Sequence, residues 1–86
     1  MANNLIETRI QRLPHRPGVY IMRDAARNII YVGKAKDLYN RVSSYFRTPI
    51  EKHTPKTQLL VEAVNDIDFY IATSEQEALI MELNFI

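Results

Sequence analysis

Residues 18–46 read GVYIMRDAARNIIYVGKAKDLYNRVSSYF, and this stretch decides the fold of the chain. Its segments GVYIM and NIIYV are rich in β-branched and aromatic residues, and the polar segment RDAARN separates them. This pattern predicts a β-hairpin with a loop longer than the tightest turns. The only two glycines of the chain lie here, Gly18 two residues before Tyr20 and Gly33 two residues after Tyr31.

Side chains alternate between the two faces of each predicted strand. In the first strand Val19 and Ile21 share one face, and Tyr20 lies on the other. In the second strand Tyr31 and Gly33 share a face. If the apolar faces of the two strands are paired, both tyrosines lie on the same side of the sheet.

Helical spacing and capping residues predict four helices around this hairpin. They cover NNLIETRIQRL at the start, DLYNRVSSYF from the cap Asp37, PKTQLLVEAV after the cap Thr54, and EQEALIMELNFI after a Ser74–Glu77 capping box. The alternating segment IDFYIA predicts a third strand. The expected order is α-β-β-α-α-β-α, which is an α+β fold with a small three-stranded antiparallel sheet flanked by helices. Residues 1–86 would form a single domain.

Composition excludes several functional classes. The chain has no cysteine, which rules out disulfides, thiolate zinc sites and thiol nucleophiles. No apolar run approaches the roughly 20 residues of a membrane span. The N-terminal residues also lack the basic-then-apolar order of a signal peptide, so we expect a cytoplasmic protein without membrane contact.

The net charge of +1 hides an asymmetry along the chain. All 11 lysines and arginines lie in residues 1–56, where the local balance is +7, whereas residues 57–86 have a balance of −6. A basic half suits a polyanionic partner, and the acidic half could hold a cation near that partner. Ordinary solvated surfaces are the alternative interpretation.

Basic residues follow the hairpin at two places, the start of the next helix and its middle. Gly33 ends the second strand and precedes Lys34 and Lys36 at a helix start, where a backbone and cations can receive phosphate. A turn glycine beside solvated lysines is the alternative. Arg41 is four residues before Tyr45, so the two share a helix face, and its guanidinium could grip a phosphate or simply lie on the tyrosine ring.

Tyrosines and one glutamate are the other candidates for chemistry. Tyr20 and Tyr31 could accept a proton if nearby cations lower the phenol pKa, although strand tyrosines are commonly packing residues. Glu82 lies in the apolar segment LIMELNFI, where a carboxylate is costly unless it is paired or binds a metal. A surface glutamate on a partly buried helix is the alternative.

These residues in this order resemble the GIY-YIG nuclease superfamily. Gly18-Val19-Tyr20 and Tyr31-Val32-Gly33 stand at the two signature triplets, each with valine in place of isoleucine. The closer resemblance is to UvrC-like members, carried by LPHRPGVYIMRD, IIYVGKAKDLYNRVSSYF and SEQEALIMELNFI, and it covers almost the whole chain. It implies a DNA endonuclease that makes the 3′-side incision in bacterial nucleotide excision repair.

The resemblance also implies roles for the candidate residues. Glu82 would hold one Mg²⁺ or Mn²⁺ ion, with waters completing the shell. Tyr31 would position or deprotonate the attacking water beside Tyr20, and Tyr45 would complete the wall of the site. Arg41 would stabilise the transferring phosphoryl group, and Lys34 would hold the phosphate or tune Tyr31. The residues expected to bind DNA are Lys34, Lys36, Arg41 and Arg47, and Gly18 and Gly33 would let the DNA backbone come close.

The partners implied by the resemblance are damaged double-stranded DNA and a UvrB–DNA complex, the latter through regions beyond this chain. The isolated domain would be a monomer. Family members run on into a segment with a further catalytic asparagine, and Asn84 does not match it, so we expect an N-terminal fragment of a larger protein that is poorly active alone. The alternatives are a non-catalytic nucleic-acid-binding module and another kind of GIY-YIG nuclease, such as a homing enzyme with a separate sequence-reading domain.

Overall fold

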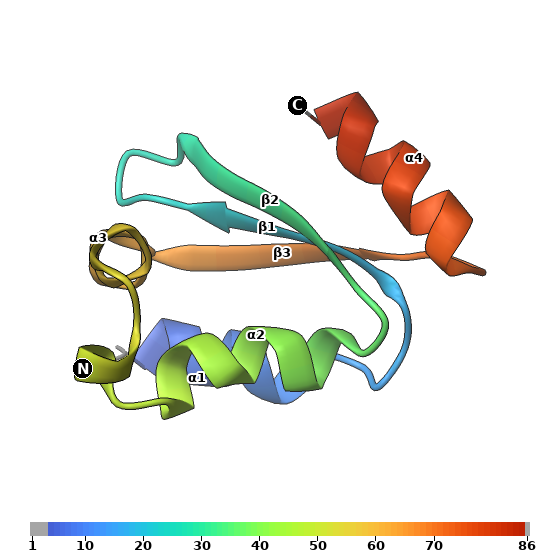
Figure 1. Ribbon diagram of the computed structural model, residues 1–86. Coiled ribbons are helices and arrows are strands. Elements are labelled where there is room, and N and C mark those ends of the chain that lie inside the picture. The colour runs from blue at the N-terminus through green and yellow to red at the C-terminus, as the bar shows by residue number, and fades with distance from the viewer. Residues whose placement is uncertain (1–3, 86) are drawn as a thin grey trace.

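The computed structural model describes residues 4–85. The elements follow the predicted order, with one additional short 3₁₀ helix, η1, after the second helix (Figure 1). Their bounds are α1 Asn4–Arg12, β1 Gly18–Arg23, β2 Ile29–Ala35, α2 Leu38–Arg47, η1 Ile50–Lys52, α3 Pro55–Ala63, β3 Asp66–Ile71 and α4 Glu75–Phe85.

The three strands form one antiparallel sheet, as predicted, and their order in the sheet is β2-β1-β3. The central strand β1 pairs Tyr20 with Gly33 and Met22 with Tyr31. This register places the tyrosines of both strands on the same face, because residues opposite each other in a pair of strands point to the same side. The hairpin prediction from period two is therefore confirmed.

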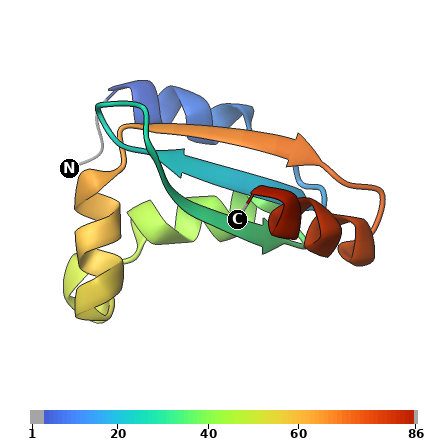
Figure 2. The same ribbon diagram turned by 90° about the horizontal axis from the view of Figure 1, so that it is seen from above.

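Helices cover both faces of the sheet (Figures 1 and 2). On one face, Tyr20 and Met22 form the main core with apolar residues from α1 and α2, including Ile10 and Leu38. On the other face, α4 covers a smaller core. The members of that smaller core are Val19, Ile21, Val32, Ala72, Ala78 and Met81. The sheet thus separates α4 from α1 and α2.

Local capping fixes where three of the helices begin. Asp37 accepts a hydrogen bond from the Asn40 amide at 3.0 Å, and Thr54 accepts one from the Thr57 amide at 3.2 Å. Ser74 Oγ accepts from the Glu77 amide at 3.2 Å. All three caps agree with the sequence prediction. In the part of the chain that the structure describes, no helix is long and apolar enough to cross a membrane.

Candidate active site

Three tyrosines from three elements meet on one side of the sheet. Tyr20 on β1, Tyr31 on β2 and Tyr45 on α2 have ring centroids 5.9 to 6.5 Å apart. The hydroxyls of Tyr20 and Tyr45 are hydrogen-bonded at 2.9 Å. Tyr20 is only 1% exposed, whereas Tyr31 is 39% exposed and lies at the surface. Tyr20 therefore lies buried at the bottom of the cluster, and the phenol of Tyr31 is open to a ligand.

Gly33 makes room for this cluster. A Cβ atom at Gly33 would lie 2.5 Å from the Tyr20 ring carbon Cζ and hydroxyl, which is far inside a normal contact. A Cβ atom at Gly18 would collide with the carbonyl oxygen of Tyr70 and lie 2.8 Å from Leu38 Cδ1. Both glycines are required by the packing of the protein itself. The expectation that they also let a DNA backbone come close stays a prediction.

Basic side chains lie beside the tyrosines. Lys34 at the end of β2 and Arg41 on α2 line a small hollow of about 110 Å³, together with Lys36 and Glu75. Lys36 and Glu75 form an exposed ion pair at 3.4 Å, a kind of contact that adds little stability. The charge of Arg41 lies close enough to Tyr20 to oppose the rise in the pKa of that phenol. Lys34, Lys36 and Arg41 thus line one hollow, and their binding of DNA stays a prediction.

Glu82 approaches the cluster from α4, on the other side of the sheet. Its side chain is half-buried, and its negative charge is one of the causes that raise the pKa of Tyr31. Within residues 4–85, no group of three His, Cys, Asp or Glu side chains could hold a metal ion. A site here would consist of a single carboxylate with waters. Mg²⁺ accepts such a site, since it usually keeps several of its waters.

The pKa values of the two strand tyrosines are shifted upward. Burial is the largest cause for Tyr20, and its hydrogen bond to Tyr45 is the next. Burial and then the neighbouring Tyr45 raise the pKa of Tyr31. The condition for proton acceptance, a phenol pKa lowered by cations, is therefore not met here, because Arg41 does not offset the burial of Tyr20 and the hydrogen bond with Tyr20 does not offset the burial of Tyr31. At neutral pH both phenols are protonated and can donate hydrogen bonds.

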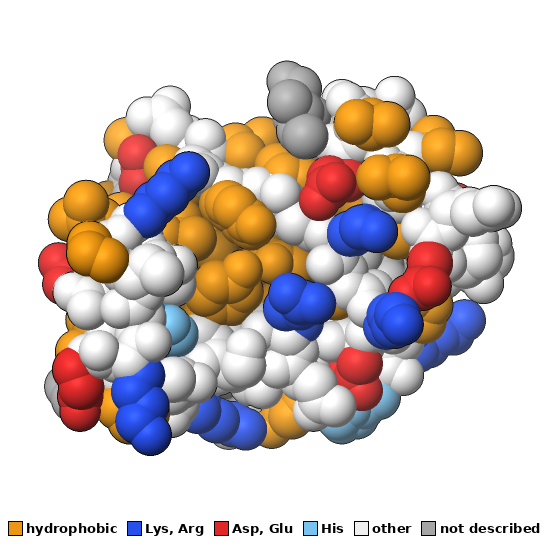
Figure 3. All heavy atoms as spheres, viewed as in Figure 1, with side chains coloured by type: hydrophobic (Ala, Val, Ile, Leu, Met, Phe, Trp, Pro, Cys, Tyr) orange, Lys and Arg blue, Asp and Glu red, His pale blue; other side chains and the backbone are white. Residues whose placement is uncertain are grey.

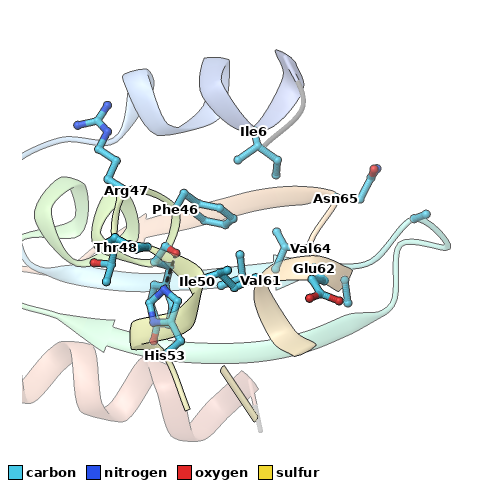
Figure 4. A pocket seen from close by; sticks show the side chains of 14 residues that line it. Ile6, Phe46, Arg47, Thr48, Ile50, His53, Val61, Glu62, Val64 and Asn65 are labelled. Atoms are coloured by element: carbon cyan, nitrogen blue, oxygen red, sulfur yellow. Dashed lines mark hydrogen bonds between the residues drawn. The ribbon is translucent and has the colours of Figure 1, made fainter. Parts of the chain in front are cut away.

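Arg47 does not join this group. Its guanidinium carbon lies 5.3 Å from the centre of the Tyr39 ring, and its Nη1 donates to the Tyr39 hydroxyl at 2.7 Å. It lines a separate hollow of about 610 Å³ that is bounded also by Ile6, Phe46, His53 and Asn65 (Figure 4). His53 Nε2 is hydrogen-bonded there to the carbonyl oxygen of Tyr45 at 2.9 Å. Arg47 thus contacts the ring of Tyr39 and not the three clustered tyrosines.

The space-filling view shows how the surface is arranged (Figure 3). A hollowed hydrophobic area lies at the middle of this face, with cationic side chains on both sides and an acidic one above. Tyr31 and Tyr45 also line a groove of about 440 Å³ with residues of α3. Sequence analysis did not single out those α3 residues, since helical spacing alone does not show which exposed face borders the site.

Comparison with known proteins agrees with this geometry. Residues 16–86 match the family described as the UvrC-like GIY-YIG domain. The "UvrABC system protein C" of Dehalococcoides mccartyi is 51% identical over the whole chain, and that of Acaryochloris marina is 49% identical over 94% of it. The chain spans only 14% and 13% of the length of these curated relatives.

A solved structure covers nearly the same region. It is the GIY-YIG N-terminal endonuclease domain of UvrC from Thermotoga maritima, described as bound to its catalytic divalent cation, magnesium. The two are 34% identical with a TM-score of 0.82, over 98% of this chain and 89% of that one. The chain therefore belongs to the UvrC-like GIY-YIG family of endonuclease domains.

Proposed function

We propose that this chain is a metal-dependent DNA endonuclease domain that hydrolyses a phosphodiester bond on the 3′ side of a lesion in nucleotide excision repair. The observation that carries the proposal is the cluster of Tyr20, Tyr31 and Tyr45 with Arg41 on one side and Glu82 on the other. One carboxylate, one guanidinium and an exposed phenol are the groups needed to hold a cation, a phosphate and a water. The magnesium-bound Thermotoga maritima domain supports it.

Each side chain has a role that follows from its position. Glu82 would hold Mg²⁺ or Mn²⁺, and the bound ion would supply a Lewis acid for the phosphate. Tyr31, the exposed phenol, would orient the attacking water. It would position that water or accept its proton, since its 39% exposure leaves the hydroxyl open to solvent. Tyr20 and Tyr45 fix the position of Tyr31 through their packing and mutual hydrogen bond.

The basic residues would act on the phosphate. Arg41 and Lys34 are exposed and line the same small hollow, so both can reach a phosphodiester placed beside the tyrosines. A guanidinium binds two phosphate oxygens at once, and such electrostatic groups typically lower a reaction barrier by about 3 kcal/mol. Arg41→Ala should therefore reduce the cutting rate more than it reduces DNA binding.

The partners belong to the same proposal. The substrate would be damaged double-stranded DNA in the bacterial cytoplasm, and the domain would act with a UvrB–DNA complex through parts of the relatives' chains that lie outside this one. The name "UvrABC system protein C" of the curated relatives supports an assembly of this kind. The domain itself would be a monomer.

The test is Glu82→Gln, which keeps the shape of the side chain and removes its charge. We expect the variant to keep its fold and to lose Mg²⁺ binding, measured by NMR titration. Placed in a full-length protein that contains this domain, the same change should abolish nicking of damaged duplex DNA in the presence of the other UvrABC components. Glu51→Gln, an exposed glutamate on η1, is the matched control and should behave as the unmodified chain. Normal nicking by Glu82→Gln would exclude the metal-ligand role. DNA binding without metal-dependent cutting by a full-length protein that contains the unmodified domain would favour the non-catalytic binding module.

A further inference from the structure

A groove runs from the tyrosine cluster to helix α3, and we call it the α3 groove. It has a volume of about 440 Å³. Its lining residues are Ile30, Tyr31, Tyr45, Lys56, Thr57, Leu59, Leu60 and Ala63. Because Tyr31 and Tyr45 belong to both the groove and the tyrosine cluster, the groove is continuous with the proposed active site.

The chemistry of the groove is apolar with a cationic rim. Leu59 is 70% exposed, which is the highest value among the large hydrophobic side chains described. Lys56 is also exposed, on the same helix three residues earlier. An exposed apolar surface beside charged groups is typical of a binding site, and the volume lies in the range of about 300–1,000 Å³ that small-molecule sites have.

Charge limits the choice of occupant. Lys34 and Arg41 lie on one side of the tyrosines, and Lys56 lies at the groove on the α3 side. The surface view shows cationic side chains on both sides of a hydrophobic hollow (Figure 3). A nucleotide strand has the same order of groups, namely phosphate, apolar sugar and base, and phosphate. Proteins that bind single strands combine cationic positions for the backbone with aromatic side chains for the bases in this way.

We propose that the α3 groove binds the nucleoside next to the phosphodiester that is cut, with its base against Tyr31 and Leu59 and its outer phosphate at Lys56. This inference rests on the proposed function, since it takes DNA as the ligand. The contact is independent of sequence, because every base offers a flat π face to an aromatic ring. The groove would therefore fix the position of the strand without selecting a sequence, which suits an enzyme that cuts beside lesions.

The experiment is an NMR titration of the ¹⁵N-labelled chain with thymidine 3′,5′-bisphosphate, and with inorganic phosphate in parallel. We expect the nucleotide to shift the amide signals of Leu59, Leu60 and Ala63, and phosphate alone to leave them in place. Leu59→Ser and Lys56→Ala should each weaken nucleotide binding by about fivefold or more, the size of one lost base or phosphate contact. The spectra themselves report whether each variant is folded.

The matched controls are Ile80→Ser and Lys52→Ala, since Ile80 is 59% exposed on α4, Lys52 is exposed on η1, and neither lines the groove. Both should bind the nucleotide as the unmodified chain does. If the nucleotide shifts only signals around Lys34 and Arg41, and Leu59→Ser binds normally, the groove assignment is overturned while the endonuclease proposal stands. If the groove signals shift but a full-length protein that contains the unmodified domain does not cut damaged DNA with Mg²⁺ and the other UvrABC components, the endonuclease proposal fails and the nucleotide site remains.

Discussion

Gly33 shows how a single residue determines the site. The absence of its Cβ leaves the space that the Tyr20 ring occupies, 2.5 Å from where that atom would be. Gly33→Ala should therefore displace the ring, break its hydrogen bond to Tyr45, and lower the free energy of unfolding by about 1–3 kcal/mol, as overpacking usually does. Urea unfolding measures the loss. Lys34→Ala, the next residue on β2, is exposed and should change stability by less than about 0.5 kcal/mol. Equal stability of Gly33→Ala and the unmodified chain would show that the ring moves without cost.

The buried phenol of Tyr20 makes stability depend on alkaline pH. Its pKa is raised in the folded chain, mainly by burial, above the value of about 10 that applies when the chain is unfolded. Stability from the neutral phenol is therefore complete below about pH 10 and falls above it, because the unfolded chain releases the proton first. Tyr20→Phe should be less stable at neutral pH by about 1 kcal/mol but lose less stability between about pH 10 and 11. Urea unfolding at several pH values tests this. Tyr70→Phe, on the exposed edge strand, keeps the phenol of Tyr20 and should retain the steep fall.

Sequence patterns could predict the faces of these residues but not their contacts. Period-two alternation placed Tyr20 and Tyr31 on one face, and the register confirms it. Sequence patterns could not show why residue 33 must be glycine, because this depends on which residue stands opposite it in the neighbouring strand. The pKa direction was also missed, since it depends on how completely the sheet and α2 bury the Tyr20 ring.

At the scale of elements, the start of α2 fixes the position of the catalytic candidates. Asp37 caps this helix, accepts bonds from the amide and side chain of Asn40, and contacts His15 Nδ1 at 2.9 Å. Asp37→Ala should lower the urea midpoint and weaken cutting, because Arg41 and Tyr45 lie on the helix that the cap orders. Asp37→Asn keeps an acceptor and is the conservative control, expected to lose less.

Acidic pH should weaken the stabilisation that the same cap provides. The backbone bond from Asn40, followed by the contact with His15, lowers the pKa of Asp37. Its carboxylate therefore contributes stability above the ordinary carboxyl range, and that contribution is lost as the pH falls through the lowered value. The difference in urea midpoint between the unmodified chain and Asp37→Ala should shrink on acidification. A constant difference down to about pH 2 would mean that the charge plays no part.

Local signals predicted the helices well, and their packing less so. The caps Asp37, Thr54 and Ser74 are properties of a few neighbouring residues, so the sequence alone could place them. The meeting of Tyr45 with Tyr20 spans 25 residues and depends on how α2 crosses the sheet. The α3 groove depends on how both α2 and α3 pack next to the sheet. Local sequence patterns therefore could not predict that Lys56 and Leu59 lie beside the tyrosines.

At the scale of the whole molecule, charge is distributed by sequence half, and the net value of +1 gives little long-range attraction to DNA. Binding should instead depend on a few cations beside the tyrosines. Each phosphate contact adds about 0.9 to the magnitude of the slope of log K against log salt. Arg41→Ala, Lys34→Ala and Lys56→Ala should each reduce that magnitude by about one, and the reductions should add in the triple variant.

Fluorescence anisotropy of a labelled DNA duplex over a range of salt concentrations measures these slopes. Arg12→Ala is the matched control, because Arg12 is an exposed arginine of α1, outside the hollow and the groove that border the tyrosines. It should leave the slope unchanged. If the control reduces the slope as much as Arg41→Ala does, DNA is held by diffuse charge over the basic half of the chain. A reduction confined to Lys34, Arg41 and Lys56 would support a DNA backbone that passes over the tyrosine cluster, because these cations border the hollow and the groove on either side of it.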